Sequence, residues 1–228
     1  MGKVSKQFSI IFSLLKVTII KVRLLEFIFI ENIISILRES INVKKKNMRK
    51  IIVTGGLGFI GSNLIDLLLK KNFFVINIDK VTYSSNFYNV KEFKKNKNYR
   101  FIRCDLNSVN KLRNIFKKFK PIGVFNLAAE THVDRSIDGP KKFMESNIFG
   151  VFNLLEVFKE YYLKNRKTKL IHISTDEVYG DVLKGRSLEK DTYRPSSPYA
   201  ATKASSDHLV SSYVRTFNLP AIITNCSN

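Results

Sequence analysis

The segment RKIIVTGGLGFIGSN (residues 49–63) decides the fold. Its apolar first part, residues 49–55, predicts a strand buried on both faces, and residues 62–71 predict a helix. Between them Gly55, Gly58 and Gly61 are spaced G-x-x-G-x-x-G. Glycine permits a tight turn and a close approach of the backbone to a pyrophosphate, and the helix N-terminus offers free N–H groups to it. The order strand, glycine loop, helix therefore predicts a dinucleotide site.

The remaining sequence repeats the alternation of strand and helix. Strands are predicted at residues 73–79, 99–105, 122–129, 169–175 and 220–226, and helices at residues 109–119, 140–163 and 197–217. Strands separated by helices imply right-handed crossovers and a parallel sheet covered on both faces. The predicted fold is α/β, a Rossmann-like doubly wound parallel sheet.

Asp79 ends the second predicted strand, 18 residues after Gly61. A carboxylate at this position accepts hydrogen bonds from the ribose hydroxyls of NAD and repels the 2′-phosphate of NADP. Lys80 beside it weakens the repulsion, and a simple turn role for Asp79 is the alternative. We predict NAD as the cofactor.

Composition limits the partners and the compartment. The 228 residues carry a net charge of +20, with 44% hydrophobic and 25% charged residues, which is typical of a globular protein. The basic residues are scattered rather than arranged in a stripe, so we expect no nucleic-acid partner, and we also expect no metal site. Cys104 and Cys226 form no disulfide framework and are expected to be small buried hydrophobes, which indicates a cytoplasmic protein.

Residues 1–47 differ from residues 48–228 and are treated as a separate N-terminal extension. Charged residues interrupt their apolar runs before the roughly 18 residues that a membrane span needs, and no signal-peptide cleavage site follows. Two interpretations stay open: translation starts at Met48, or the extension is an amphipathic helix on a membrane surface. The expected partners otherwise include no membrane.

Two later motifs suggest catalysis, ISTDEVYGD (residues 173–181) and YAATK (residues 199–203). Tyr199 and Lys203 are four residues apart, so they share one helix face, and an ammonium near a phenol lowers the phenol's pKa. This pair predicts a tyrosine base that removes a hydroxyl proton while a hydride leaves. Asp176 and Glu177 are either a solvated turn or an acid and a base whose mutual repulsion separates their pKa values.

These motifs, together with LAAETHVDRSIDGP (residues 127–140) and TNCSN (residues 224–228), resemble the extended short-chain dehydrogenase/reductase superfamily. Within it they are most similar to the dTDP-glucose 4,6-dehydratase family. The resemblance implies oxidation of a nucleotide-activated hexose at C4, loss of water across C5 and C6, and return of the hydride to C6.

The resemblance also implies roles for single residues. Tyr199, assisted by Lys203, deprotonates the 4-hydroxyl that Thr175 holds; Glu177 is the base at C5 and Asp176 the acid at C6. Cofactor contacts carry over to Gly55, Gly58, Phe59, Ile60, Gly61, Asp79, Lys80, Val81, Thr82, Asp105, Leu106, Leu127, Ala128, Ala129, Thr131, Ser146, Tyr199 and Lys203. Substrate contacts carry over to Thr131, Thr175 and Asn228, whereas His132, Asp134 and Arg135 belong to a family loop without an assigned role.

The family pattern continues beyond Asn228, where this sequence ends, so the C-terminal substrate-binding domain is predicted to be largely missing. Either the sequence is a fragment, or it is a truncated product with weak NAD binding and little turnover. A UDP- or GDP-sugar dehydratase or decarboxylase, and an inactive NAD-binding protein, remain alternatives.

Members of the family dimerise through the two long helices, so a homodimer is expected, although the apolar residues of these helices fit equally well against the sheet. They are Phe143, Phe149, Phe152, Leu155 and Phe158 in one helix, and Leu209, Tyr213 and Phe217 in the other.

Overall fold

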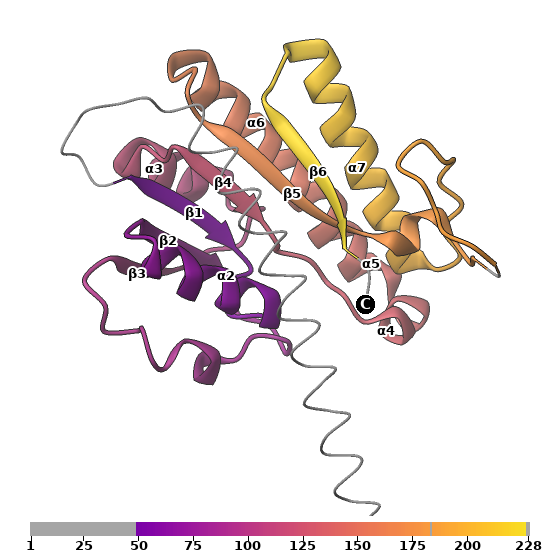
Figure 1. Cartoon of the computed structure of the whole chain (residues 1–228), viewed down its shortest axis with the longest axis horizontal. Coiled ribbons are helices and arrows are strands. Elements are labelled where there is room, and N and C mark those ends of the chain that lie inside the picture. Colours follow the sequence, from indigo (N-terminus) through magenta and orange to yellow (C-terminus); the bar gives the residue numbers. More distant parts are fainter. Residues whose placement is uncertain (1–48, 183, 227–228) are drawn as a thin grey trace, which may run out of the picture. The chain divides into compact units, whose positions relative to one another are not determined.

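A parallel sheet of six strands forms the centre of the fold (Figure 1). The computed structural model describes residues 49–182 and 184–226, so the predictions for residues 1–47 and for Asn228 lie outside it. The strand order is β3-β2-β1-β4-β5-β6, with every pair parallel. The strands are β1 (Lys50–Thr54), β2 (Phe74–Asp79), β3 (Tyr99–Arg103), β4 (Gly123–Asn126), β5 (Lys169–Thr175) and β6 (Ala221–Cys226). This order confirms the predicted doubly wound sheet.

Helices lie in most of the connections between the strands. They are α2 (Phe59–Lys70), α3 (Val109–Phe119), α4 (Val133–Asp138), α5 (Pro140–Phe143), α6 (Gly150–Lys164) and α7 (Pro198–Phe217). A π-helix (Met144–Phe149) joins α5 to α6, and two short 3-10 turns, η1 (Phe87–Val90) and η3 (Asp176–Tyr179), complete the set. From β1 the chain adds β2 and β3 on one side of the sheet, and it then crosses to add β4, β5 and β6 on the other side. Because the direction of the connections reverses, α2 covers one face of the sheet, while α3, α6 and α7 pack side by side on the opposite face (Figure 1).

The core lies between the sheet and the layer of three helices. Ile52, Ile76 and Val124 from the strands meet Leu154 and Phe158 from α6, and all are fully buried. Each such side chain contributes about 1.5–3 kcal/mol through burial. This packing fixes the carboxyl ends of the strands, where the candidate site lies.

The apolar residues predicted on the two long helices divide between core and surface. Phe143, Leu155, Phe158 and Tyr213 are buried, and Leu209 packs against the core. Exposed are Phe149 (59%), Phe152 (41%) and Phe217 (40%). Only these three remain for the predicted homodimer contact. Over the described ranges, no helix is long and apolar enough to cross a membrane.

Candidate active site

A cavity of about 510 Å³ opens at the carboxyl ends of the strands. Loops after β1 and β4 leave the sheet in opposite directions there, which is where open α/β sheets bind ligands. All the predicted cofactor residues line this cavity except Val81 and Thr82. Val81 adopts a left-handed φ of 66°, and the loop turns there so that Ser84 and Ser85 face the cavity instead.

The glycine loop brings the N-terminus of α2 against the end of β1. Gly55 has a φ of +70°, and a Cβ there would lie 2.8 Å from the backbone of Leu127 and Ala128. A Cβ on Gly61 would lie 2.4 Å from the carbonyl oxygen of Gly55. Gly58 is the N-cap of α2 and has no side chain that could accept a hydrogen bond. The first N–H groups of α2 therefore face the loop without a capping acceptor. This backbone suits phosphate oxygens, and the residues present therefore fit a dinucleotide.

Asp79 ties the glycine loop to the loop after β2. The backbone N–H of Leu57 donates to Oδ2 (3.0 Å), while Val81 N–H (2.8 Å) and the Ser85 hydroxyl (2.9 Å) donate to Oδ1. A carboxylate has about four acceptor positions, so this buried group keeps room for one ribose hydroxyl. Asp79 thus shapes the loop as well as facing the cavity.

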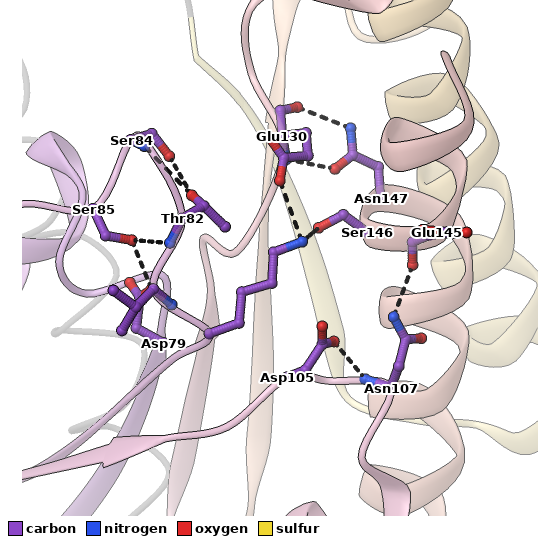
Figure 2. A network of polar contacts seen from close by, with 12 residues as sticks. Asp79, Thr82, Ser84, Ser85, Asp105, Asn107, Glu130, Glu145, Ser146 and Asn147 are labelled. Carbon is purple, nitrogen blue, oxygen red and sulfur yellow. Dashed lines mark hydrogen bonds and ion pairs between the residues drawn. The ribbon is translucent and has the colours of Figure 1, made fainter. Parts of the chain in front are cut away.

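Lys80 reaches from the loop after β2 to Glu130 and Ser146, two residues of the polar network in Figure 2. Its Nζ lies 3.2 Å from Glu130 Oε1 and donates to Ser146 Oγ at 3.2 Å. Glu130 is buried, and its backbone is held by the Asn147 amide, which accepts from Glu130 N and donates to Glu130 O. The cation beside Asp79 is therefore paired with a carboxylate. Because Glu130 neutralises its charge, Lys80 no longer argues against a preference for NAD over NADP.

The carboxylate pair follows β5 directly. Thr175 caps η3, its Oγ1 accepting from Glu177 N–H (3.3 Å) and donating to Asp176 Oδ1 (3.4 Å). Thr175 and Glu177 line the cavity, whereas Asp176 lies beside them outside its lining. Burial, and then the charge of Asp176, raise the pKa of Glu177. A carboxylate with a raised pKa is a stronger base, which suits proton abstraction.

Tyr199 enters the cavity from the first turn of α7. Ser197 caps this helix by accepting from Ala200 N–H, and Pro198 follows it. Tyr199 N–H donates to the hydroxyl of Ser136 on α4 (3.0 Å). Burial, and then the charge of Glu177, raise the pKa of Tyr199 to about 12, while a hydrogen bond with Thr175 lowers it.

Lys203 lies one turn further along α7 and lines the same cavity. Its ammonium donates to the carbonyl of Ile173 (2.7 Å), and burial lowers its pKa to about 8. The predicted lowering of the Tyr199 pKa is therefore wrong for this structure, since burial and the charges of Glu177 and Asp176 raise this pKa.

Several lining residues were not predicted from the sequence. Cys104 and Cys226 belong to the cavity wall, and burial raises the pKa of the Cys104 thiol, which keeps it protonated. His132 also lines the cavity, and Arg135 stacks on the ring of Tyr83 at 3.8 Å. The segment that carries His132 and Arg135 thus contacts the loop after β2 through Tyr83. Asp134 lies in the first turn of α4. Within residues 49–182 and 184–226, no group of three potential metal ligands occurs.

The family model described as GDP-mannose 4,6 dehydratase matches residues 52–228. The chain belongs to this family. It is 48% identical over 189 residues to a dTDP-glucose 4,6-dehydratase from Haemophilus influenzae, covering 79% of this chain and 56% of that protein. The chain thus spans about half the length of the curated relatives it matches.

Solved structures of family relatives share the fold. The dTDP-glucose 4,6-dehydratase from Bacillus anthracis in complex with NAD has 38% identity and a TM-score of 0.70, covering 79% of this chain and 55% of that one. The UDP-glucose 4-epimerase from Thermus thermophilus in complex with NAD has 34% identity and a TM-score of 0.69, covering 77% and 54%. Similarity therefore extends to both dehydratases and epimerases, and the choice between them depends on the site.

Proposed function

We propose that this chain carries the cofactor-binding and catalytic half of an NAD-dependent dTDP-glucose 4,6-dehydratase. The observation that carries the proposal is the placement of Glu177 and Tyr199 in one cavity with the glycine loop, with Asp176 adjoining Glu177. The dehydratase relatives and the NAD complex from Bacillus anthracis support it. A bound NAD would supply the hydride acceptor for C4 of the sugar and the hydride donor for C6.

Tyr199 removes the proton of the 4-hydroxyl, and the Thr175 hydroxyl orients that group. The phenol stays protonated while its pKa stands near 12 and cannot accept a second proton, so it needs cationic charge beside it to ionise. This chain supplies that charge through the Lys203 ammonium, and a bound NAD would add the positive charge of its nicotinamide ring. Oxidation at C4 then makes the C5 proton acidic.

Glu177 takes this C5 proton, and Asp176 gives a proton to the C6 hydroxyl, which leaves as water. Glu177 returns its proton to C5 when the hydride enters C6. The substrate loses one water molecule in total, and Tyr199 ends the cycle protonated while Asp176 ends it ionised. One proton must therefore pass from the tyrosine to the aspartate, by way of solvent, before the next turnover.

An epimerase needs the hydride acceptor and the tyrosine, but no acid and base at C5 and C6. Epimerases of the superfamily typically carry small residues where Asp176 and Glu177 stand. The adjacent carboxylates thus favour dehydration over epimerisation. The base and sugar of the substrate rest on the dehydratase relatives alone.

Two further properties belong to this proposal. A homodimer through α6 and α7 is supported by the exposed rings of Phe149, Phe152 and Phe217. A cytoplasmic location is supported by the two cysteines, both free thiols in the structure. Size-exclusion chromatography with light scattering tests the first property, and cell fractionation tests the second.

The test of the activity uses dTDP-glucose, NAD and the longest product that the gene encodes. We expect a 4-keto-6-deoxy sugar by nuclear magnetic resonance. The Glu177→Gln variant should still oxidise C4 but stop before elimination, so that NADH accumulates on the protein. A C4 epimer as the product, or no NADH in the variant and no product in the parent, would contradict the proposal.

A further inference from the structure

A buried carboxylate, Asp207, lies on α7 behind the catalytic residues. It follows Lys203 by four residues and Tyr199 by eight, so the three share one helix face. Asp207 is 1% exposed. Its Oδ2 accepts from Ser174 Oγ (2.6 Å) and from Tyr193 Oη (3.2 Å). Its Oδ1 has no hydrogen-bond partner within the described residues, although His172 Nε2 lies 3.4 Å away.

A carboxylate buried this deeply requires a nearby cation, because hydroxyl donors alone offset little of its lost hydration. His172 is one candidate, but its proton pattern is fixed by neighbours. Thr54 Oγ1 donates to Asn126 Oδ1 (2.6 Å), so the Asn126 amide nitrogen donates to His172 Nδ1 (3.0 Å). The ring therefore keeps its single proton on Nε2.

Burial also lowers the pKa of His172, which keeps the ring neutral. The remaining cation of this cluster is Lys203, which is itself buried. Of the charges that act on Lys203, Asp207 has the largest effect in favour of the ammonium, opposing the burial that lowers its pKa to about 8. Lys203 precedes Asp207 by one turn on the same face of α7 and both side chains are buried, so these two opposite charges act on each other inside the fold.

We propose that Asp207 is a positioning residue that keeps Lys203 protonated, and so keeps its ammonium available to the cofactor in the cavity. The inference rests on the proposed function, because it assigns Lys203 to the NAD site. Ser174 adds a second link, since Asp207 holds the residue that precedes Thr175.

Other groups around Lys203 come from three elements. Tyr199 lies on α7 with it, His172 and the accepting carbonyl of Ile173 belong to β5, and Cys226 belongs to β6. Tyr199 and His172 are neutral near pH 8 because of their shifted pKa values. Cys226 acts in the same direction as Asp207 only in its ionised form, and with less effect. Asp207 is therefore the group to change.

The test follows the affinity for NAD against pH by isothermal titration calorimetry. The ammonium is lost as the pH rises through the Lys203 pKa, so affinity should fall above about pH 8. Asp207→Asn keeps the shape and the acceptor for Ser174 but removes the charge. It should move the midpoint of this fall down by about one pH unit or more. Lys203→Met should abolish the fall.

Tyr193→Phe is the matched control, because it removes a hydrogen bond to Asp207 and leaves the charge. Its midpoint should equal that of the parent. An unchanged midpoint in Asp207→Asn, or an equal shift in Tyr193→Phe, would overturn the inference. Absence of NAD binding by the parent would instead refute the proposed function.

A folding defect in Asp207→Asn would itself be informative. If the defect arises from an uncompensated lysine, adding Lys203→Met should restore the thermal midpoint of the double variant. If Asp207 serves only to hold Ser174 and Tyr193, the double variant should be at least as unstable as Asp207→Asn. That second result would overturn the inference.

Discussion

The proposed cofactor half of the crevice (residues 55–61 and 79–85) is built from backbone, whereas the proposed catalytic half (Thr175–Glu177, Tyr199 and Lys203) is built from ionisable side chains. In the first half, glycines bring backbone within contact distance of backbone, and Asp79 binds two N–H groups and a hydroxyl. In the second half, burial and neighbouring charges shift the pKa values of Glu177, Tyr199 and Lys203. The first half should therefore respond to added atoms, and the second to changes of charge or pH.

The largest effect is expected from Gly61→Ala in the cofactor half. The new Cβ would meet the Gly55 carbonyl oxygen at 2.4 Å, and this oxygen is a backbone atom that cannot turn away. Relief requires α2 to move away from β1, so we expect loss of measurable NAD binding and a destabilisation of about 1–3 kcal/mol, typical of overpacking. Calorimetric titration with NAD and thermal unfolding measure the two effects.

Gly150→Ala is the matched control for this substitution. Its Cβ would meet Leu106 at 3.5 Å, an ordinary contact, and alanine favours the helix. Unchanged or slightly higher stability is expected. Normal NAD binding by Gly61→Ala would show that the close approach of α2 is not needed for the cofactor.

Tyr199→Phe should have the next largest effect, and in the catalytic half alone. It removes the proposed base but keeps the ring, and general-base catalysis contributes roughly 10²–10⁴ in rate. Turnover of dTDP-glucose should fall by that factor while NAD affinity changes little. A matching loss of NAD affinity would mean that the two halves are not separable.

The sequence predicts most of the sheet because its signals are local. Residues 109–119 and 169–175 were predicted with the observed bounds of α3 and β5, since polar or turn residues flank each run. The helix α4 was missed because its six residues VDRSID are too short to show a period. The π-helix was missed as well, since its hydrogen-bond shift depends on how α5 and α6 pack.

The candidate site divides in the same way. Tyr199 and Lys203 follow from a spacing of four residues, and Glu177 from the end of a strand. The roles of Ser136 and Asp207 cannot be predicted in this way. Their hydrogen-bond partners lie 63 and 33 residues away in the sequence and come into contact only after the helices pack. The pKa of Tyr199 was predicted in the wrong direction for this reason: burial of the ring depends on tertiary packing.

Lys203→Met should change how stability depends on pH. The pKa of Lys203 is about 8 in the fold and about 10.4 in an unfolded chain. Between these values the unfolded state binds more protons, so the parent gains stability as the pH rises from about 8 to 10.4. The variant lacks this gain, so the stability of the parent relative to the variant should rise over this interval.

Thermal midpoints of both proteins from pH 7 to pH 10 measure this effect, and their difference removes the titration of other groups. The midpoint of the parent should rise by a few degrees relative to that of the variant as the pH rises, since 1 kcal/mol corresponds to roughly 2–4 °C at this size. A constant gap would show that Lys203 does not titrate in this range.

The smallest effect is expected from Ser85→Ala in the cofactor half. Ser85 is one of three donors to Asp79, and the N–H groups of Leu57 and Val81 remain. Loss of one hydrogen bond costs about 0.5–1.5 kcal/mol. We therefore expect a slightly lower thermal midpoint, and NAD affinity within a few-fold of the parent. Because the cofactor half is held mainly by backbone N–H groups, a loss of affinity as large as that of Gly61→Ala would contradict the contrast between the halves.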